Sequence, residues 1–247
     1  MCTEDIEELR RYLERGGFMS RAFLWSQSAL FTEGILSGTE AGVCEAFLNM
    51  SDPVFATTGR ADLIESHRFG SNLGSILDRY VYGNGVTGLG AHPLEIICID
   101  VSCGPRDRRI NRPEAEAVKA FLDSDGAEDY CVLSPYRTQV DTLRDVMPER
   151  EARILTVHRS QGREWDTVVL SVQDGTGCNR EVPLRFTSSL SDTGLKVINT
   201  AVSRAKRRLV VVCERDFWLS RSEELIGGLV GDSACSKVLH WDNGSLT

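Results

Sequence analysis

Short apolar runs alternate with amphipathic stretches along the last three quarters of the chain. Runs that are apolar at nearly every position are typical of strands covered on both faces of a parallel sheet, and apolar residues at three- and four-residue intervals are typical of helices. Their alternation predicts an α/β fold, a mostly parallel sheet flanked by helices. The predicted elements are a helix over 71–82, a strand over 95–101, a helix over 113–123, a strand over 130–134, a helix over 137–147, strands over 153–157 and 167–173, a helix over 195–206 and a strand over 208–213.

The first quarter of the chain has helical periodicity and no predicted strand. A helix is expected over 4–15, and further helical patterns fill about 20–50 until Ser51-Asp52-Pro53 interrupts them. We therefore expect two parts, a helical extension or connector over 1–62 and an α/β domain over 63–247.

The stretch 174–194 is long for a connection inside a compact domain. That length favours a functional or a disordered segment. Because its Thr187–Ser191 portion is rich in hydroxyl side chains, this portion suits a mobile flap.

A polar turn lies between the strands predicted over 153–157 and 167–173. Open α/β sheets bind their ligands at the carboxyl ends of the strands, so the turn is expected to form part of a site at that edge. Its hydroxyl, amide, glycine and carboxylate positions are Ser160, Gln161, Gly162, Glu164 and Asp166.

This turn and its flanking strands resemble motif V of superfamily 1 helicases, T-V-H-x-S-Q-G-x-E-x-D-x-V. Other segments resemble further motifs of that family, in the family's order, over about residues 63–215. They are Leu63–Phe69, similar to the L-x-x-x-Y-R segment that opens the second RecA-like domain, Ile110–Ala115, similar to N-x-x-E-A, Ser134–Gln139, similar to T-P-Y-x-x-Q, and Leu195–Val212, similar to motif VI.

The resemblance implies the second, C-terminal RecA-like (P-loop NTPase-like) domain of a superfamily 1 helicase. The branch it resembles includes the nonsense-mediated-decay helicase and the Dna-two-type nuclease-helicases. Such enzymes couple ATP hydrolysis to translocation along, or unwinding of, nucleic acid. The resemblance therefore implies ATP with Mg²⁺ as cofactor, held between two RecA-like domains, and single-stranded DNA or RNA as partner.

The motifs of the first RecA-like domain do not occur in the sequence. The Gly-rich stretches 34–42 and 83–90 lack the lysine and the following hydroxyl of the G-x-x-x-x-G-K-[ST] loop (Walker A), and no apolar strand ends in Asp-Glu (Walker B). Those groups hold the phosphates and the magnesium. We therefore expect no ATPase activity from the chain alone. A first RecA-like domain with Walker A, in cis upstream or in trans, is the expected partner.

Two arginines match catalytic positions of the family. Arg204 matches the motif VI arginine that contacts the γ-phosphate from across the cleft, and Arg68 has a parallel role in the opening segment. A guanidinium remains charged and donates two parallel hydrogen bonds to phosphate oxygens. The alternative for Arg204 is a surface ion pair near the end of the helix predicted over 195–206.

Other residues match nucleotide-binding positions. Gly162 and Glu164 correspond to motif V positions that approach the phosphate and the ribose, and Gln161 to a link between nucleotide and bound strand. His67 replaces a tyrosine that stacks on adenine, so the imidazole either stacks there or is solvated. Trp165 either stacks a base or packs in the core.

A third set is expected to contact nucleic acid. Thr156, His158 and Ser160 can position a strand through its phosphates, because hydroxyl and imidazole groups do so without reading sequence. Tyr136 and Arg137 begin a helix, where exposed N–H groups favour anions. The alternatives are that His158 ties two loops together and that Tyr136 packs against the sheet.

The charge of the chain restricts how it meets nucleic acid. With a net charge of −8 and a pI near 5.1, the whole molecule does not attract a polyanion, so any phosphate contact must be local. The basic clusters are Arg106–Arg112 and Arg204–Arg208, and such runs are usually solvated faces.

The cysteines favour a reducing environment. None of the 8 cysteines forms a C-x-x-C pair, and Cys98, Cys131 and Cys213 lie inside predicted strands, where cysteine acts as a small apolar residue. No metal site is expected. Without a secretory or spanning segment in the sequence, we expect a cytoplasmic protein with no membrane partner.

Two other functions remain open. One is a stand-alone, non-catalytic module with a RecA-like fold that binds nucleic acid or protein. Whether the DNA just upstream encodes a Walker-A-bearing domain would distinguish it from a helicase half. The other is an unrelated α/β hydrolase or transferase, against which the absence of G-x-S-x-G and G-x-G-x-x-G argues.

Overall fold

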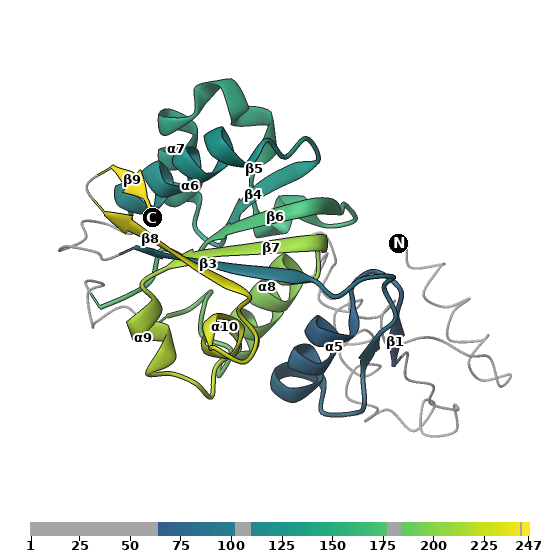
Figure 1. Cartoon of the computed structure of the whole chain (residues 1–247). Coiled ribbons are helices and arrows are strands. Elements are labelled where there is room, and N and C mark those ends of the chain that lie inside the picture. The colour runs from purple at the N-terminus through teal and green to yellow at the C-terminus, as the bar shows by residue number, and fades with distance from the viewer. Residues whose placement is uncertain (1–63, 102–109, 177–183, 243) are drawn as a thin grey trace, which may run out of the picture. The chain divides into compact units, whose positions relative to one another are not determined.

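A parallel sheet is the centre of the computed structural model, which describes residues 64–101, 110–176, 184–242 and 244–247 (Figure 1). Within these residues the sheet has the strand order β5-β4-β6-β7-β3-β8-β9, and every neighbouring pair is parallel except β8 with β9. The strands are β3 (Glu95–Val101), β4 (Tyr130–Ser134), β5 (Ile154–Thr156), β6 (Trp165–Ser171), β7 (Ala205–Cys213), β8 (Lys237–Asp242) and β9 (Ser245–Leu246).

Helices cover both faces of this sheet (Figure 1). On one face α6 (Arg112–Asp125) and α7 (Arg137–Val146) pack on side chains such as Val132 and Val210. The other face is covered by α8 (Asp192–Val202), α9 (Arg215–Leu219) and α10 (Leu225–Val230), and α5 (Ser71–Leu77) packs beside α10. The predicted α/β, RecA-like arrangement is therefore confirmed.

The strands that are apolar throughout begin and end where the sequence predicts. β3 and β4 have the predicted bounds, and their interior residues are buried on both faces except Asp100, which is partly exposed. Cys98, Cys131 and Cys213 are buried in strands, as expected. Continuous hydrophobicity is thus a sufficient signal for the central strands.

The boundary between α8 and β7 differs from the prediction of a helix over 195–206. Ser191 caps α8 by accepting a hydrogen bond from the Gly194 N–H, and the helix ends at Val202. β7 begins at Ala205, three residues before the strand predicted over 208–213. The reason is strand pairing, because Ala205 is already opposite Trp165 of β6.

The segment between α5 and β3 folds back on itself. A π-helical turn (Asp78–Tyr82) continues α5, so the helix predicted over 71–82 is present with altered winding. β1 (Glu65–Ser66) and β2 (Thr87–Gly88) then pair in parallel. A Cβ at Gly88 would lie 2.1 Å from the Gly70 carbonyl oxygen, so only glycine permits this close approach.

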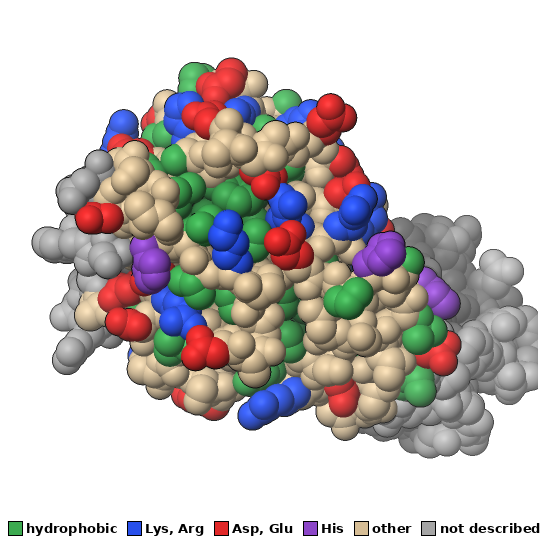
Figure 2. All heavy atoms as spheres, viewed as in Figure 1, with side chains coloured by type: hydrophobic (Ala, Val, Ile, Leu, Met, Phe, Trp, Pro, Cys, Tyr) green, Lys and Arg blue, Asp and Glu red, His purple; other side chains and the backbone are tan. Residues whose placement is uncertain are grey.

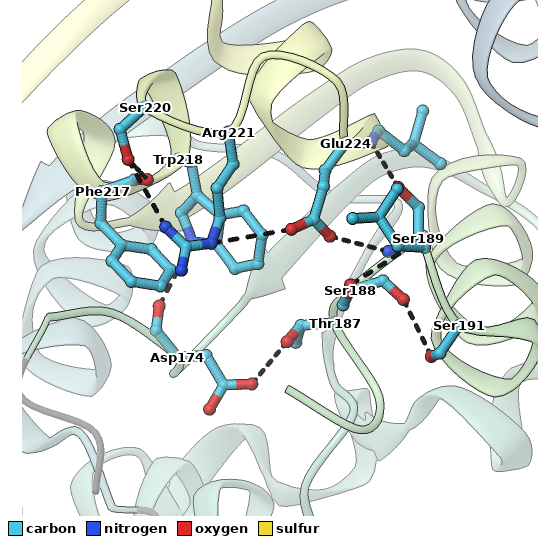
Figure 3. A network of polar contacts seen from close by, with 12 residues as sticks. Asp174, Thr187, Ser188, Ser189, Ser191, Phe217, Trp218, Ser220, Arg221 and Glu224 are labelled. Atoms are coloured by element: carbon cyan, nitrogen blue, oxygen red, sulfur yellow. Dashed lines mark hydrogen bonds and ion pairs between the residues drawn. The ribbon is translucent and has the colours of Figure 1, made fainter. Parts of the chain in front are cut away.

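The Thr187–Ser191 segment is anchored, in contrast to the expected mobile flap (Figure 3). The Thr187 hydroxyl donates to Asp174 Oδ2 at 2.5 Å. The Ser189 N–H donates to Glu224 at 3.0 Å, and the Ser189 hydroxyl accepts from the Leu225 N–H at 2.8 Å. Partners distant in sequence therefore fix a hydroxyl-rich segment that resembles a loop.

A buried carboxylate joins α6 to the end of β6. Glu114 is fully buried and accepts hydrogen bonds from the Ser171 hydroxyl at 2.6 Å and from the Gln173 N–H at 3.0 Å. Gln139 of α7 donates to the same Ser171 hydroxyl at 3.1 Å and to the Asn111 carbonyl at 2.9 Å. The N-x-x-E-A and T-P-Y-x-x-Q segments are thus parts of one polar network.

Glu65–Thr247 form one compact unit. The helices expected within 1–62 lie outside the described residues, and so does most of the Arg106–Arg112 cluster. No helix in the described part of the chain has the length and apolar character that crossing a bilayer requires. Elements that the periodicity did not predict include β1, β2, α9, α10, β8, β9 and the 3-10 helix Pro148–Arg153.

We predict that Glu114→Ala lowers the free energy of unfolding by about 3 kcal/mol, because buried donors lose their acceptor. Urea denaturation followed by tryptophan fluorescence measures this loss. The control is Glu116→Ala on the same helix, whose exposed ion pair with Arg112 contributes about 0.5 kcal/mol or less. Equal losses in the two variants would contradict the role given to Glu114.

Candidate functional site

Arg68, Glu164 and Arg204 come together at the amino ends of β6 and β7. Arg68 Nε lies 2.6 Å from Glu164 Oε1, with both side chains about one-third exposed. Arg68 Nη1 donates to the carbonyl of Ser203, the residue before Arg204, at 3.4 Å. Three residues that the sequence assigned to one nucleotide site are therefore neighbours.

Parallel pairing of β6 and β7 produces this neighbourhood. The Trp165 N–H donates to the Arg204 carbonyl at 3.1 Å, and Trp165 lies opposite Ala205. The residues just before the two strands, Glu164 and Arg204, must therefore meet. This corrects the expectation of a site at the carboxyl ends of the strands, because Glu164 lies at the amino edge.

Arg204 occupies an electropositive and partly desolvated position. Burial lowers the pKa of Arg204, the positive charge of Arg68 lowers it further, and Glu164 opposes both effects. Its Nε is buried and has no hydrogen-bond partner among the described residues. The surface ion pair considered for Arg204 is not formed here, and a buried donor without an acceptor suits an anionic ligand.

The other residues assigned to the nucleotide site are exposed or have open space beside them. Gly162 has φ +75°, and a Cβ there would meet nothing within 4 Å. Gln161 and His67 are exposed. The unpartnered Arg204 Nε suits an anionic group such as a phosphate, and the surface at Gly162 is open.

The residues expected to contact a strand differ in accessibility. Val157–Ser160 form a short 3-10 helix after β5, and Thr156 and His158 keep exposed surface. Ser160 is fully buried, and its hydroxyl donates to the Val157 carbonyl at 2.6 Å. In this conformation Ser160 stabilises the turn and presents no hydroxyl to a ligand.

Tyr136 and Arg137 have opposite environments although they are adjacent. Tyr136 is buried, packs edge-on against Phe186 and donates to Asp174 Oδ2 at 2.5 Å. Burial, and then the nearby Asp174 charge, raise the pKa of Tyr136. Tyr136 therefore packs within the domain, which is the alternative considered from the sequence, whereas Arg137 is exposed.

The Arg204–Arg208 cluster is largely neutralised after Arg204. Lys206 lies 3.0 Å from Asp166, and Arg208 lies 2.6 Å from Asp125. Trp165 is only 8% exposed and packs in the core beneath Arg163. Trp165 is thus a core residue, and most of this basic run serves ion pairing.

Sequence reasoning missed two arginines near the expected strand contacts. Arg144 and Arg159 line a surface pocket of about 250 Å³ with Arg137 and Thr156. The seven-residue spacing of Arg137 and Arg144 was the available signal, because it places both on one face of a helix.

Comparison with known proteins found one matching family model and several similar curated proteins. Residues 99–216 match the model of an AAA domain family. The chain is 34% identical over 100 residues to DNA-binding protein SMUBP-2 of Rattus norvegicus, covering 39% of this chain and 9% of that protein. It is 29% identical over 99 residues to the DNA replication ATP-dependent helicase/nuclease JHS1 of Arabidopsis thaliana, covering 40% of this chain and 7% of that protein.

Among solved structures, the PRRSV helicase has a TM-score of 0.35 with this chain at 17% identity, over 65% of this chain and 25% of that one. The matched part of the chain spans less than a tenth of the length of these curated relatives. The family match and the curated relatives agree with the motifs. Together they support a superfamily 1 helicase-like domain in this chain.

We predict that Glu164→Gln makes the chain bind inorganic tripolyphosphate about threefold to fivefold more tightly. The carboxylate competes with the added anion for Arg68, and a partly exposed ion pair of this kind contributes about 1 kcal/mol or less. Titration calorimetry at low salt measures the change.

The matched control is Glu95→Gln, which removes the same charge from a carboxylate at the same edge, one paired with Arg208. If both variants gain equally, the effect is one of net charge, and the assigned competition for Arg68 is wrong.

Proposed function

We propose that the domain is the C-terminal RecA-like half of a superfamily 1 helicase, of the branch with the nonsense-mediated-decay and Dna-two-type enzymes. The observation that carries this proposal is the meeting of Arg68, Glu164 and Arg204 at one edge of the sheet. A first domain that carries the Walker motifs completes the ATPase, because no such motif occurs in these 247 residues.

In this proposal the two arginines act on the γ-phosphate. Arg204 directs its unpartnered Nε and the rest of its planar fork toward a phosphate held by the first domain. Arg68 exchanges its contact with Glu164 for the same phosphate. ATP with Mg²⁺ supplies the transferable phosphoryl group when both domains are present. The arginines contribute by stabilising the charge that develops during transfer.

The remaining residues bind the nucleoside. Glu164, once released from Arg68, accepts from the ribose hydroxyls. The open backbone at Gly162 admits a phosphate, and Gln161 lies between nucleotide and strand. His67 is exposed and can stack on the base with less area than the tyrosine of the family.

A nucleic-acid strand is proposed to run along the opposite end of the sheet. The relatives are named as a DNA-binding protein and a DNA replication helicase/nuclease, which supports a single strand of DNA or, by the wider resemblance, RNA. Thr156, His158 and Arg137 have exposed surface for its backbone. Ser160 and Tyr136 act from beneath as supports, since both are buried. A cytoplasmic location remains part of the proposal.

We predict that the purified chain shows no ATPase activity above background, with or without single-stranded nucleic acid. The phosphate loop and the metal-holding carboxylates that position a γ-phosphate do not occur in it. A coupled phosphate-release assay checks this. Turnover that survives purification and disappears in Arg204→Ala would contradict a half-site and show that the chain is an ATPase by itself.

We predict that Arg204→Lys retains nucleotide binding and lowers kcat at least tenfold once a first RecA-like domain is supplied by fusion or in trans. Lysine keeps the charge and loses the planar fork, and arginines of this kind are worth roughly 10³–10⁵ in rate. Steady-state kinetics measure kcat and KM separately.

The matched control is Arg207→Lys, an exposed arginine of the same strand end. If Arg204→Lys changes kcat by about twofold or less, which is below roughly 0.5 kcal/mol, Arg204 does not contact the γ-phosphate. Nanomolar binding of strands by the chain without any acquired ATPase activity would favour the stand-alone binding module instead.

A further inference from the structure

A pocket of about 250 Å³ lies between α7 and the segment that follows β5. Arg137, Val140, Asp141 and Arg144 repeat at helical spacing, so they form one face of α7. Thr156 at the end of β5 and Arg159 in the following 3-10 helix face them across the pocket. Two elements distant in sequence therefore build one concave surface.

The pocket is basic within an acidic molecule. Its lining has three guanidinium groups and one carboxylate, Asp141, whereas the whole chain carries a net charge of −8. No carboxylate in the described ranges comes within 4.0 Å of the guanidiniums of Arg137, Arg144 or Arg159. On the face drawn in Figure 2, by comparison, basic and acidic side chains are interspersed.

One of these guanidiniums is held in place by the backbone. Arg144 Nη2 donates to the Ile154 carbonyl at 2.8 Å, and its Nε is buried without a hydrogen-bond partner in the described part of the chain. The floor beneath it is apolar, since Val140 is 2% exposed. A donor that is already held in place loses little conformational entropy when it binds an anion.

We infer that this pocket binds a phosphate of a single-stranded nucleic-acid backbone, with Arg144 and Arg159 as its principal donors. The inference rests on the proposed function and adds residues that no helicase motif in the sequence assigns. Guanidinium groups match the geometry of phosphate oxygens, and such contacts position a strand without reading its bases. Arg137 and Thr156 lie on the same wall, so the pocket extends the strand contacts proposed for them.

The test is a titration of the full chain at low salt with a short oligothymidylate, followed by the Nε–Hε NMR signals of its arginines. Binding by this single domain is expected to be weak, on the order of 10⁻⁴ M or poorer. The signals of Arg144 and Arg159 should shift with the natural strand. They should not shift with an uncharged methylphosphonate strand of the same length, nor with inorganic phosphate at matched phosphate concentration.

Variants that remove a positive or a negative charge from the pocket should change strand affinity in opposite directions. Arg159→Gln should weaken strand binding about threefold to tenfold and lower the log–log salt slope by about 0.7, the value for one single-strand phosphate contact. Asp141→Asn should strengthen binding, because it removes the only carboxylate described in the pocket lining. The charge-matched control, Arg207→Gln at the opposite edge of the sheet, should change affinity by less than twofold.

Arg144→Lys is the conservative variant that separates a loss of binding from a loss of folding, because it keeps the positive charge and removes only the planar guanidinium group. It should weaken binding less than Arg144→Gln does. Equal shifts with inorganic phosphate would overturn the strand assignment and identify a free-anion pocket.

Unchanged strand affinity in both Arg159→Gln and Arg144→Gln would overturn the pocket and leave the proposed helicase half standing. If the unsubstituted chain does not bind the strand at all, the nucleic-acid part of the proposed function fails together with the pocket.

Discussion

The pairing of β6 with β7 is the constraint on which the candidate site depends. The hydrogen bond from the Trp165 N–H to the Arg204 carbonyl joins two helicase-like motifs at the residues just before their strands. Parallel strands start at the same edge, so Glu164 and Arg204 are adjacent whatever the intervening chain does. The adjacency of these two side chains therefore follows from strand pairing and does not depend on the chain between β6 and α8. A rigid sheet edge is a suitable support for groups that must hold a phosphate in one geometry.

Electrostatics explain why a carboxylate belongs among these arginines. Two guanidiniums at one sheet edge repel each other, and partial burial adds a desolvation cost, which is why the pKa of Arg204 is lowered by burial and by Arg68. Glu164 offsets the repulsion through Arg68. Arg204 then retains an unsatisfied donor, so the cluster is stable without a ligand and still attracts an anion. The carboxylate therefore serves the ligand-free state as well as any ribose contact.

The sequence predicted the elements whose bounds follow from local hydrophobic pattern. It did not predict the boundaries and anchored segments that depend on contacts with residues distant in sequence. β3 and β4 have their predicted bounds because their interior positions are apolar, with Asp100 of β3 as the exception. α8 ends before Arg204 because Ala205 pairs with Trp165 of β6 as part of a strand. The periodicity of the sequence does not show whether a residue at such a boundary joins the helix or the strand. α9 and α10 are too short for a periodic signal. Thr187–Ser191 has the composition of a loop, and its order comes from the distant Asp174 and Glu224. The motifs predicted that Arg68, Glu164 and Arg204 lie close together. They did not predict the edge of the sheet at which these residues meet.

The two edges of the sheet have separate chemistry, and one continuous segment connects them. Thr156 ends β5 at the level of Ser134, near the carboxyl end of β4, whereas Thr167, just after Glu164, lies opposite Tyr130 at its amino end. Residues 157–164 must therefore cross the length of the strand in a few residues. Buried Val157 and the internal hydrogen bond of Ser160 stiffen this crossing. A crossing of this kind has less freedom than an open loop, because it is fixed at Val157 and Ser160 between the pocket and Glu164. The segment 157–164 thus connects the pocket at one end of the sheet to Glu164 at the other.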